Sequence, residues 1–205
     1  MSRVLSLTVS SYVRRSTLKT VPAALYLTES HEANELLARD PLALLIGFAL
    51  DQQVTVPTAF AGPQKLRERI GELDPGTIAS MDPAKLEEAF RAKPAIHRFP
   101  GSMARRVQEL CAVVADEYGG RAERVWSEAA DAADLRKRIG ALPGFGEMKI
   151  KGLGSVLALR FGVEAAQELV PDHPCLGRID SPESLAEYQA AKRAHKAALR
   201  ASQTA

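Results

Sequence analysis

Two glycines separated by one residue form the segment of the chain with the most evident chemistry. Leu142-Pro143-Gly144-Phe145-Gly146 joins an apolar-periodic helix, expected from Leu135, to a second periodic helix that ends near Gly162. Glycines at both positions allow a tight turn and leave the backbone amides uncovered. The first amides of a helix have no partner inside the helix, so they can bind a phosphate oxygen. We therefore predict a phosphate-binding turn between two helices over residues 135–162.

The charge around this turn favours the same interpretation. Residues 136–160 contain six basic residues against the single acid Glu147; the six are Arg136, Lys137, Arg138, Lys149, Lys151 and Arg160. A basic surface around uncovered amides is typical of nucleic-acid binding. The alternative is that the turn is only a structural corner between two helices.

The turn and an upstream helix together resemble a known family. Leu142 to Gly146 resembles the helix-hairpin-helix of the HhH-GPD DNA glycosylases, the superfamily of endonuclease III. The apolar helix expected from Pro41 to Leu50, with Asp40 as its N-cap, is similar to the family's early helix, because it ends in Asp51-Gln52-Gln53. In that family a Gln-bearing turn faces the DNA. The likeness covers about residues 33–172, and it implies DNA repair by base excision.

The resemblance also implies the fold. We expect an all-α, two-lobed structure with a central helical lobe over residues 33–160, which ends in the helix-hairpin-helix. Residues 1–32 and 161–205 would form the second lobe. The groove between the lobes would hold double-stranded DNA and the active site.

A glycosylase breaks the bond between base and sugar through a transition state with positive charge on the sugar, and a carboxylate stabilises that charge. The resemblance implies Asp172 as this carboxylate, because Val170-Pro171-Asp172-His173 follows the hairpin helix. Asp180, which opens the next helix, is an alternative. Each could instead be structural, Asp172 in a loop turn and Asp180 as a helix cap.

The residue types also predict which groups contact DNA. In the hairpin these are Gly144, Phe145, Gly146, Met148, Lys149 and Lys151. Gln52 or Gln53 can reach base edges or fill the gap left by an extruded base. Arg105 and Arg106 are expected in the first turns of a helix from Ser102 to Tyr118, where the helix dipole disfavours cations unless an anion is present. His97, in a loop beside Arg98, could contact DNA or be solvated.

The resemblance further predicts the type of glycosylase. Bifunctional members carry a nucleophilic lysine two residues after the second glycine of the turn. This chain has Met148 there, with Lys149 beside it. One residue turns a side chain by about 100° on a helix. We therefore expect a monofunctional enzyme in which Lys149 binds a phosphate.

Composition limits the remaining possibilities. The 205 residues have a net charge of +2 and only two cysteines, Cys111 and Cys175. Because only one cysteine follows the hairpin, the four-cysteine iron–sulfur cluster of some members of the resembled family cannot form. We predict no metal ligands and no cofactor. The one exception is a monovalent cation on the turn carbonyls, which the resemblance implies. No apolar run has transmembrane length. We expect a monomer located in the cytoplasm, with the nucleoid if bacterial.

Two further interpretations stay open. The chain could be a non-catalytic DNA-binding protein on the glycosylase scaffold, or a helical protein–protein adaptor without affinity for DNA. Residues 1–30 contain no acid before Glu29, and Leu5, Leu7 and Val9 alternate with polar residues. This segment could be a short strand, a DNA-contacting arm or a targeting segment.

Overall fold

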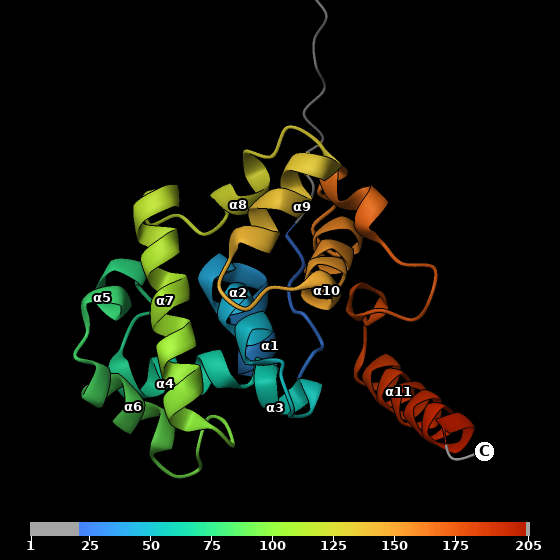
Figure 1. The fold of residues 1–205 in the computed structure, drawn as a ribbon, viewed down its shortest axis with the longest axis horizontal. Helices are drawn as coiled ribbons and strands as arrows, with labels where there is room; N and C mark the ends of the chain where they lie inside the picture. The colour runs from blue at the N-terminus through green and yellow to red at the C-terminus, as the bar shows by residue number, and fades with distance from the viewer. Residues whose placement is uncertain (1–20, 204–205) are drawn as a thin grey trace, which may run out of the picture.

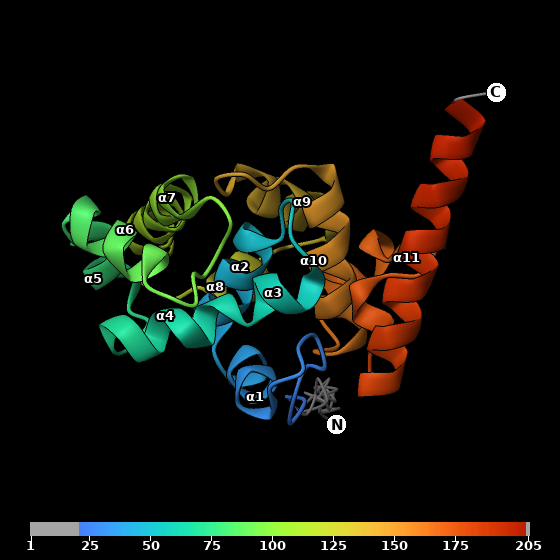
Figure 2. The ribbon, with the colours of Figure 1, turned by 90° about the horizontal axis from the view of Figure 1, so that it is seen from below.

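The computed structural model describes residues 21–203, and the segment 1–20, with its predicted strand or targeting sequence, lies outside the described residues. Helices and connecting loops make up the whole of this part of the chain, in which no strand occurs (Figures 1 and 2). The predicted all-α fold is confirmed.

Three helices of the first half, α2, α5 and α6, begin where Asp-Pro pairs stand in the sequence. Asp40 caps α2 by accepting the N–H groups of Leu42 at 2.9 Å and Ala43 at 3.1 Å. Asp74 and Asp82 cap α5 and α6 in the same way. Proline follows each aspartate, at a position whose N–H needs no helical partner. The helices of this half are α1 (His31–Arg39), α2 (Pro41–Leu50), α3 (Val56–Phe60), α4 (Gly62–Ile70), α5 (Pro75–Ser80), α6 (Pro83–Arg91) and α7 (Pro100–Tyr118).

Helix α7 differs from the prediction at its start. It begins at Pro100, two residues before the expected start at Ser102, and Phe99 is its N-cap. The ring of Pro100 already has the φ of a helix, so it extends the helix without a side-chain cap.

Helix α2 is the centre of the fold. Every residue from Leu42 to Leu50 is buried, as the apolar sequence predicts for a helix covered on all sides. Phe48 meets Phe60 of α3 edge-on, with ring centroids 5.0 Å apart. Helices α1, α3, α4 and α7 all pack against α2, and α5 and α6 cover α7. The two ends of α2 are therefore held in fixed positions, and one of them reaches the hairpin.

The second half of the chain builds the hairpin and then wraps around it. It consists of α8 (Arg124–Ser127), α9 (Ala132–Ala141), α10 (Glu147–Leu159), the short 3-10 helices η1 (Glu164–Leu169) and η2 (Leu176–Arg178), and α11 (Pro182–Gln203). Gly177 of η2 donates its N–H to the Ser155 hydroxyl at 3.1 Å. A Cβ at Gly177 would stand 2.1 Å from the Ser155 carbonyl oxygen, so η2 is pressed onto α10.

The two predicted lobes are in close contact. Helix α10 packs against both η1 and η2, which lie beyond the predicted boundary at residue 160. Residues from Tyr26 to Asn34 and the start of α11 line one shallow cavity, so the N- and C-terminal segments lie side by side. The division into residues 33–160 and two terminal segments stays a prediction.

Candidate nucleic-acid interface

The turn between α9 and α10 has an open face. Gly144 has a φ of +78°, a conformation suited to glycine. The N–H of Phe145 donates to the Leu142 carbonyl at 3.1 Å and closes the turn. Gly146 is the N-cap of α10, which has no side-chain cap, and a Cβ at Gly146 would meet no atom within 4 Å. The side chain of Phe145 is buried, so only its backbone can belong to the open face.

Arg106 of α7 lies directly against this turn. A Cβ built on Gly144 would stand 2.9 Å from both Cδ and Nε of Arg106. The Nη1 atom of Arg106 donates to the side-chain oxygen of Gln52. One guanidinium group therefore connects the hairpin with the Gln-bearing turn after α2. The structure brings together three of the predicted features that are far apart in the sequence.

His97 fixes the Gln-bearing turn from its other side. Its Nδ1 accepts the N–H of Phe99 at 3.1 Å, which leaves the Nε2 proton to donate to the Gln52 carbonyl at 2.9 Å. The ring is 2% exposed, and burial is the main reason why the pKa of His97 is lowered. The predicted contact of His97 with DNA is therefore wrong, and so is the alternative that its ring is solvated. The residue instead holds the turn. Gln53 follows with a φ of 58°, exposed to solvent.

Lys149 points inward, to the end of α2. Its Nζ donates to the Ala49 carbonyl at 2.9 Å and lies 5.5 Å from the centre of the Phe145 ring. Burial, and then the charge of Arg106, lower the pKa of Lys149 to about 8, while Asp51 opposes the shift. The structure brings this amine to a cavity beside the hairpin. Its predicted contact with a phosphate stays a prediction.

This cavity has a volume of about 740 Å³ and lies between the end of α2, the start of α10, the loop before η2 and α11. Asp51, Gln53 and Lys149 line it, together with Phe48 and Tyr188. Four cations also line the cavity, namely Arg98, Lys149, Lys151 and Lys192. Burial raises the pKa of Asp51, and the charges of Lys192 and Lys149 oppose this rise. Ligand sites in proteins typically have such a size and such a mixture of apolar and charged walls.

The two aspartates predicted from the sequence lie outside the lining of this cavity. Asp172 is exposed, and its neighbours Pro171 and His173 contribute to the wall while Asp172 does not. Asp180 is also exposed, and its backbone N–H donates to the Ser184 hydroxyl at the start of α11. Asp51 is the carboxylate that the described part of the chain contributes to the wall.

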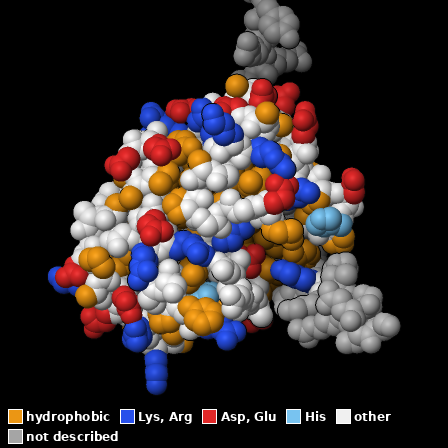
Figure 3. Space-filling model, viewed as in Figure 1, with side chains coloured by type: hydrophobic (Ala, Val, Ile, Leu, Met, Phe, Trp, Pro, Cys, Tyr) orange, Lys and Arg blue, Asp and Glu red, His pale blue; other side chains and the backbone are white. Residues whose placement is uncertain are grey.

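The remaining predicted DNA contacts are on the surface. Met148 is 78% exposed, and Arg105 is exposed with no ion pair among residues 21–203. Lys151 and Arg136 both pair with Glu147, at 3.6 and 2.7 Å, so part of the predicted positive charge is neutralised. Lys and Arg side chains nevertheless gather across the middle of the face that contains α7 and α10 (Figure 3).

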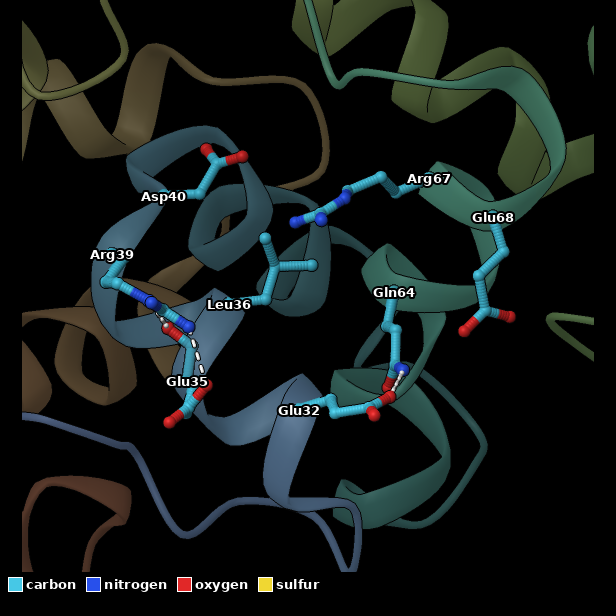
Figure 4. Close-up of a pocket in the computed structure, with 8 residues that line it drawn as sticks. All are labelled: Glu32, Glu35, Leu36, Arg39, Asp40, Gln64, Arg67 and Glu68. Atoms are coloured by element: carbon cyan, nitrogen blue, oxygen red, sulfur yellow. Dashed lines mark hydrogen bonds and ion pairs between the residues drawn. The ribbon is translucent and has the colours of Figure 1, made fainter.

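A second cavity, of about 780 Å³, lies between α1 and α4. Its charged side chains come from these two helices and from Asp40, the N-cap of α2 (Figure 4). Arg39 pairs with Glu35 at 2.6 Å, and the Gln64 amide donates to Glu32 at 2.8 Å. None of its lining residues belongs to the hairpin or to the Gln-bearing turn, so we place the candidate site at the cavity beside α10.

The arrangement of an apolar central helix, a Gln-bearing turn and an open glycine hairpin can be compared with known families. The family model described as HhH-GPD superfamily base excision DNA repair protein matches residues 46–194. The chain belongs to this superfamily. The match begins inside α2 and ends in α11, so this HhH-GPD protein has both turns and the whole cavity within the matched region. Membership gives it a glycosylase-like role in base-excision DNA repair and binding to DNA.

No curated protein matches the chain. Within residues 21–203 of this HhH-GPD protein, no helix has both the length and the apolar character needed to cross a membrane.

Sequence reasoning missed several residues that line the cavity. Asp51 stands directly before Gln52 and Gln53, so its place in the predicted DNA-facing turn could have indicated a role in the site. Tyr188 carries no such signal, because α11 reaches the cavity only through the folding of the loop before it. The Nζ atom of Lys192 lies 5.8 Å from the centre of the Tyr188 ring.

Proposed function

We propose that this protein is a monofunctional DNA glycosylase that binds double-stranded DNA through the hairpin and hydrolyses the N-glycosidic bond of a damaged or mismatched base. The observation that carries the proposal is the cavity of about 740 Å³ beside the hairpin. An enzyme that acts on a base within a duplex must extrude that base into a pocket. The cavity opens next to both elements that would hold the DNA.

The DNA-binding part of the proposal rests on the open turn and on the cations around it. The uncovered amides at the start of α10 suit a phosphate oxygen, and Arg105 and Arg106 add positive charge from α7. Gln53 is exposed beside the cavity, so we assign it, and not the hydrogen-bonded Gln52, to the gap left by the extruded base. Met148 stands where bifunctional relatives have their lysine, which supports hydrolysis without strand cleavage.

A monovalent cation at the hairpin belongs to the same proposal. Such ions take backbone carbonyl oxygens as ligands, and the turn from Leu142 to Gly146 offers carbonyls without a carboxylate. The cation would add positive charge beside the bound phosphate. We propose that the enzyme has no iron–sulfur cluster, is a monomer and is located in the cytoplasm, with the nucleoid if the organism is bacterial.

The experiment is a glycosylase assay on duplexes that carry damaged or mismatched bases, with binding measured on the same duplexes at several salt concentrations. Base release without strand cleavage supports the proposal. Strand cleavage that accompanies base release, together with a covalent enzyme–DNA adduct formed when borohydride reduces a Schiff base, would show a lyase and so contradict the monofunctional assignment.

A second function is a non-catalytic DNA-binding protein on the glycosylase scaffold. The exposed position of Asp172, outside the cavity, favours it. Salt-dependent duplex binding without release from any substrate is the result that this second function predicts.

A further inference from the structure

The cavity contains a carboxylate that the sequence comparison did not assign. We propose that Asp51, and not Asp172, is the catalytic carboxylate of the glycosylase reaction, and that the Lys149 amine is its partner acid. This inference rests on the proposed function. It follows from the position of Asp51 in the cavity wall, where Asp172 is absent.

The backbone around Asp51 is held firmly. Asp51 is the C-cap of the buried helix α2, and its N–H donates to the carbonyls of Gly47 and Phe48 at 3.1 and 3.2 Å. The next residue, Gln52, is fixed through its carbonyl by His97 and through its side chain by Arg106. A catalytic group needs this kind of support, because small displacements weaken catalysis strongly.

The position of Asp51 is unfavourable for stability alone. A carboxylate at the C-terminal end of a helix is repelled by the helix dipole. Asp51 is also largely removed from water, and burial is the main cause that raises its pKa. No ion pair within 4.0 Å involves Asp51 in the described part of the chain. Groups kept in such settings are often functional.

Lys149 is placed to act with Asp51. Its Nζ is held by the carbonyl of Ala49, two residues before Asp51, and both side chains line the same cavity. One of the three protons of the ammonium group is used in this hydrogen bond. The others remain for a leaving base. A pKa of about 8 for Lys149 is close to neutral, where proton transfer in catalysis is most efficient.

The hydrolysis then has a complete balance of atoms and charges. A water oxygen forms a bond to C1′ of the sugar while the bond between C1′ and the base nitrogen breaks, and the electron pair of that bond leaves with the base. Asp51 first stabilises the positive charge on the sugar and then accepts a proton from the water. The Lys149 ammonium gives a proton to the leaving base. Exchange with solvent returns Asp51 to its carboxylate and Lys149 to its ammonium form.

The test compares single-turnover base release by the wild type with that of Asp51→Asn, Asp51→Glu and Asp172→Asn, on a substrate that the wild type cleaves. Glu168→Gln is a matched control on the exposed surface of η1. Loss of a positioned acid–base group lowers the rate by about 100-fold or more, so we expect this loss in Asp51→Asn, partial recovery in Asp51→Glu and wild-type release by Glu168→Gln.

Two further measurements separate catalysis from folding. We expect Asp51→Asn to bind duplex DNA at least as well as the wild type, because it removes a negative charge, and to melt at the same or a higher temperature. Release retained in Asp51→Asn but lost in Asp172→Asn would overturn the inference and leave the proposed function intact. Failure to find any duplex from which the wild type releases a base would instead refute the proposed function.

Discussion

Gly144 offers a quantitative test of how the hairpin is connected to the rest of the site. In Gly144→Ala the new Cβ would require a φ of +78° from an alanine, and it would stand 2.9 Å from Cδ and Nε of Arg106. The left-handed conformation costs about 1–2 kcal/mol for a residue with a Cβ. Displacement of Arg106 would break its hydrogen bond to Gln52, which costs about 1 kcal/mol more. We therefore expect a loss of about 2–3 kcal/mol in the free energy of unfolding.

Gly146→Ala is the matched control for this variant. Gly146 has a φ of −88°, which alanine adopts freely, and its Cβ would meet no atom within 4 Å. We expect its stability to stay within about 0.5 kcal/mol of the wild type. The added methyl group lies beside the uncovered amides, so duplex binding should weaken by about fivefold, the equivalent of one lost hydrogen bond of about 1 kcal/mol.

Urea denaturation followed by the fluorescence of Trp126, the only tryptophan, measures both stabilities. Fluorescence anisotropy with a labelled duplex measures the affinities. A Gly144→Ala protein as stable as Gly146→Ala would refute the described packing of Arg106 on the turn. Unchanged affinity in Gly146→Ala would refute the role of the hairpin amides in binding phosphate.

Other perturbations test separate parts of the structure. Burial and the charge of Arg106 lower the pKa of Lys149 to about 8, against the effect of Asp51. The folded state therefore binds fewer protons than the unfolded state between about pH 8 and 10.5, the ordinary pKa of lysine. Stability should therefore rise with pH through this window in the wild type relative to Lys149→Gln, and denaturation at pH 7.5 and 9.5 measures the difference. Gly177→Ala should lose about 3 kcal/mol or more, because its Cβ would stand 2.1 Å from the Ser155 carbonyl oxygen, and a melting temperature close to that of the wild type would contradict this packing. Arg105→Ala should weaken duplex binding and reduce the dependence of log Kd on log salt by about one unit; an unchanged slope would exclude a phosphate contact by Arg105.

The local features of the fold could be predicted from the sequence. The Asp-Pro starts of α2, α5 and α6 and the turn at Gly144 depend on neighbouring residues, so short patterns were sufficient. Helix α7 starts before the predicted Ser102, because Pro100 can occupy the first turn without a side-chain cap.

The site was less predictable because its geometry depends on distant segments. Lys149 belongs to the predicted hairpin, but the direction of its amine is set by the Ala49 carbonyl at the end of α2. The position of Asp172 was inferred from a family resemblance, and the sequence does not show which side chains of that loop face the cavity. Asp51 stands in a segment that the resemblance had already singled out, yet only the fold shows that it reaches the cavity wall.

The hydrogen bonds that assemble the DNA-facing surface join residues far apart along the chain. His97 and Arg106 stand 45 and 54 residues after Gln52, and Lys149 stands 100 residues after Ala49. Contacts of such long range form late, because the intervening chain must first become ordered. A chain cut before Lys149 would contain the residues that join His97 and Arg106 to Gln52, but it would lack the hydrogen bond that connects α10 with the end of α2.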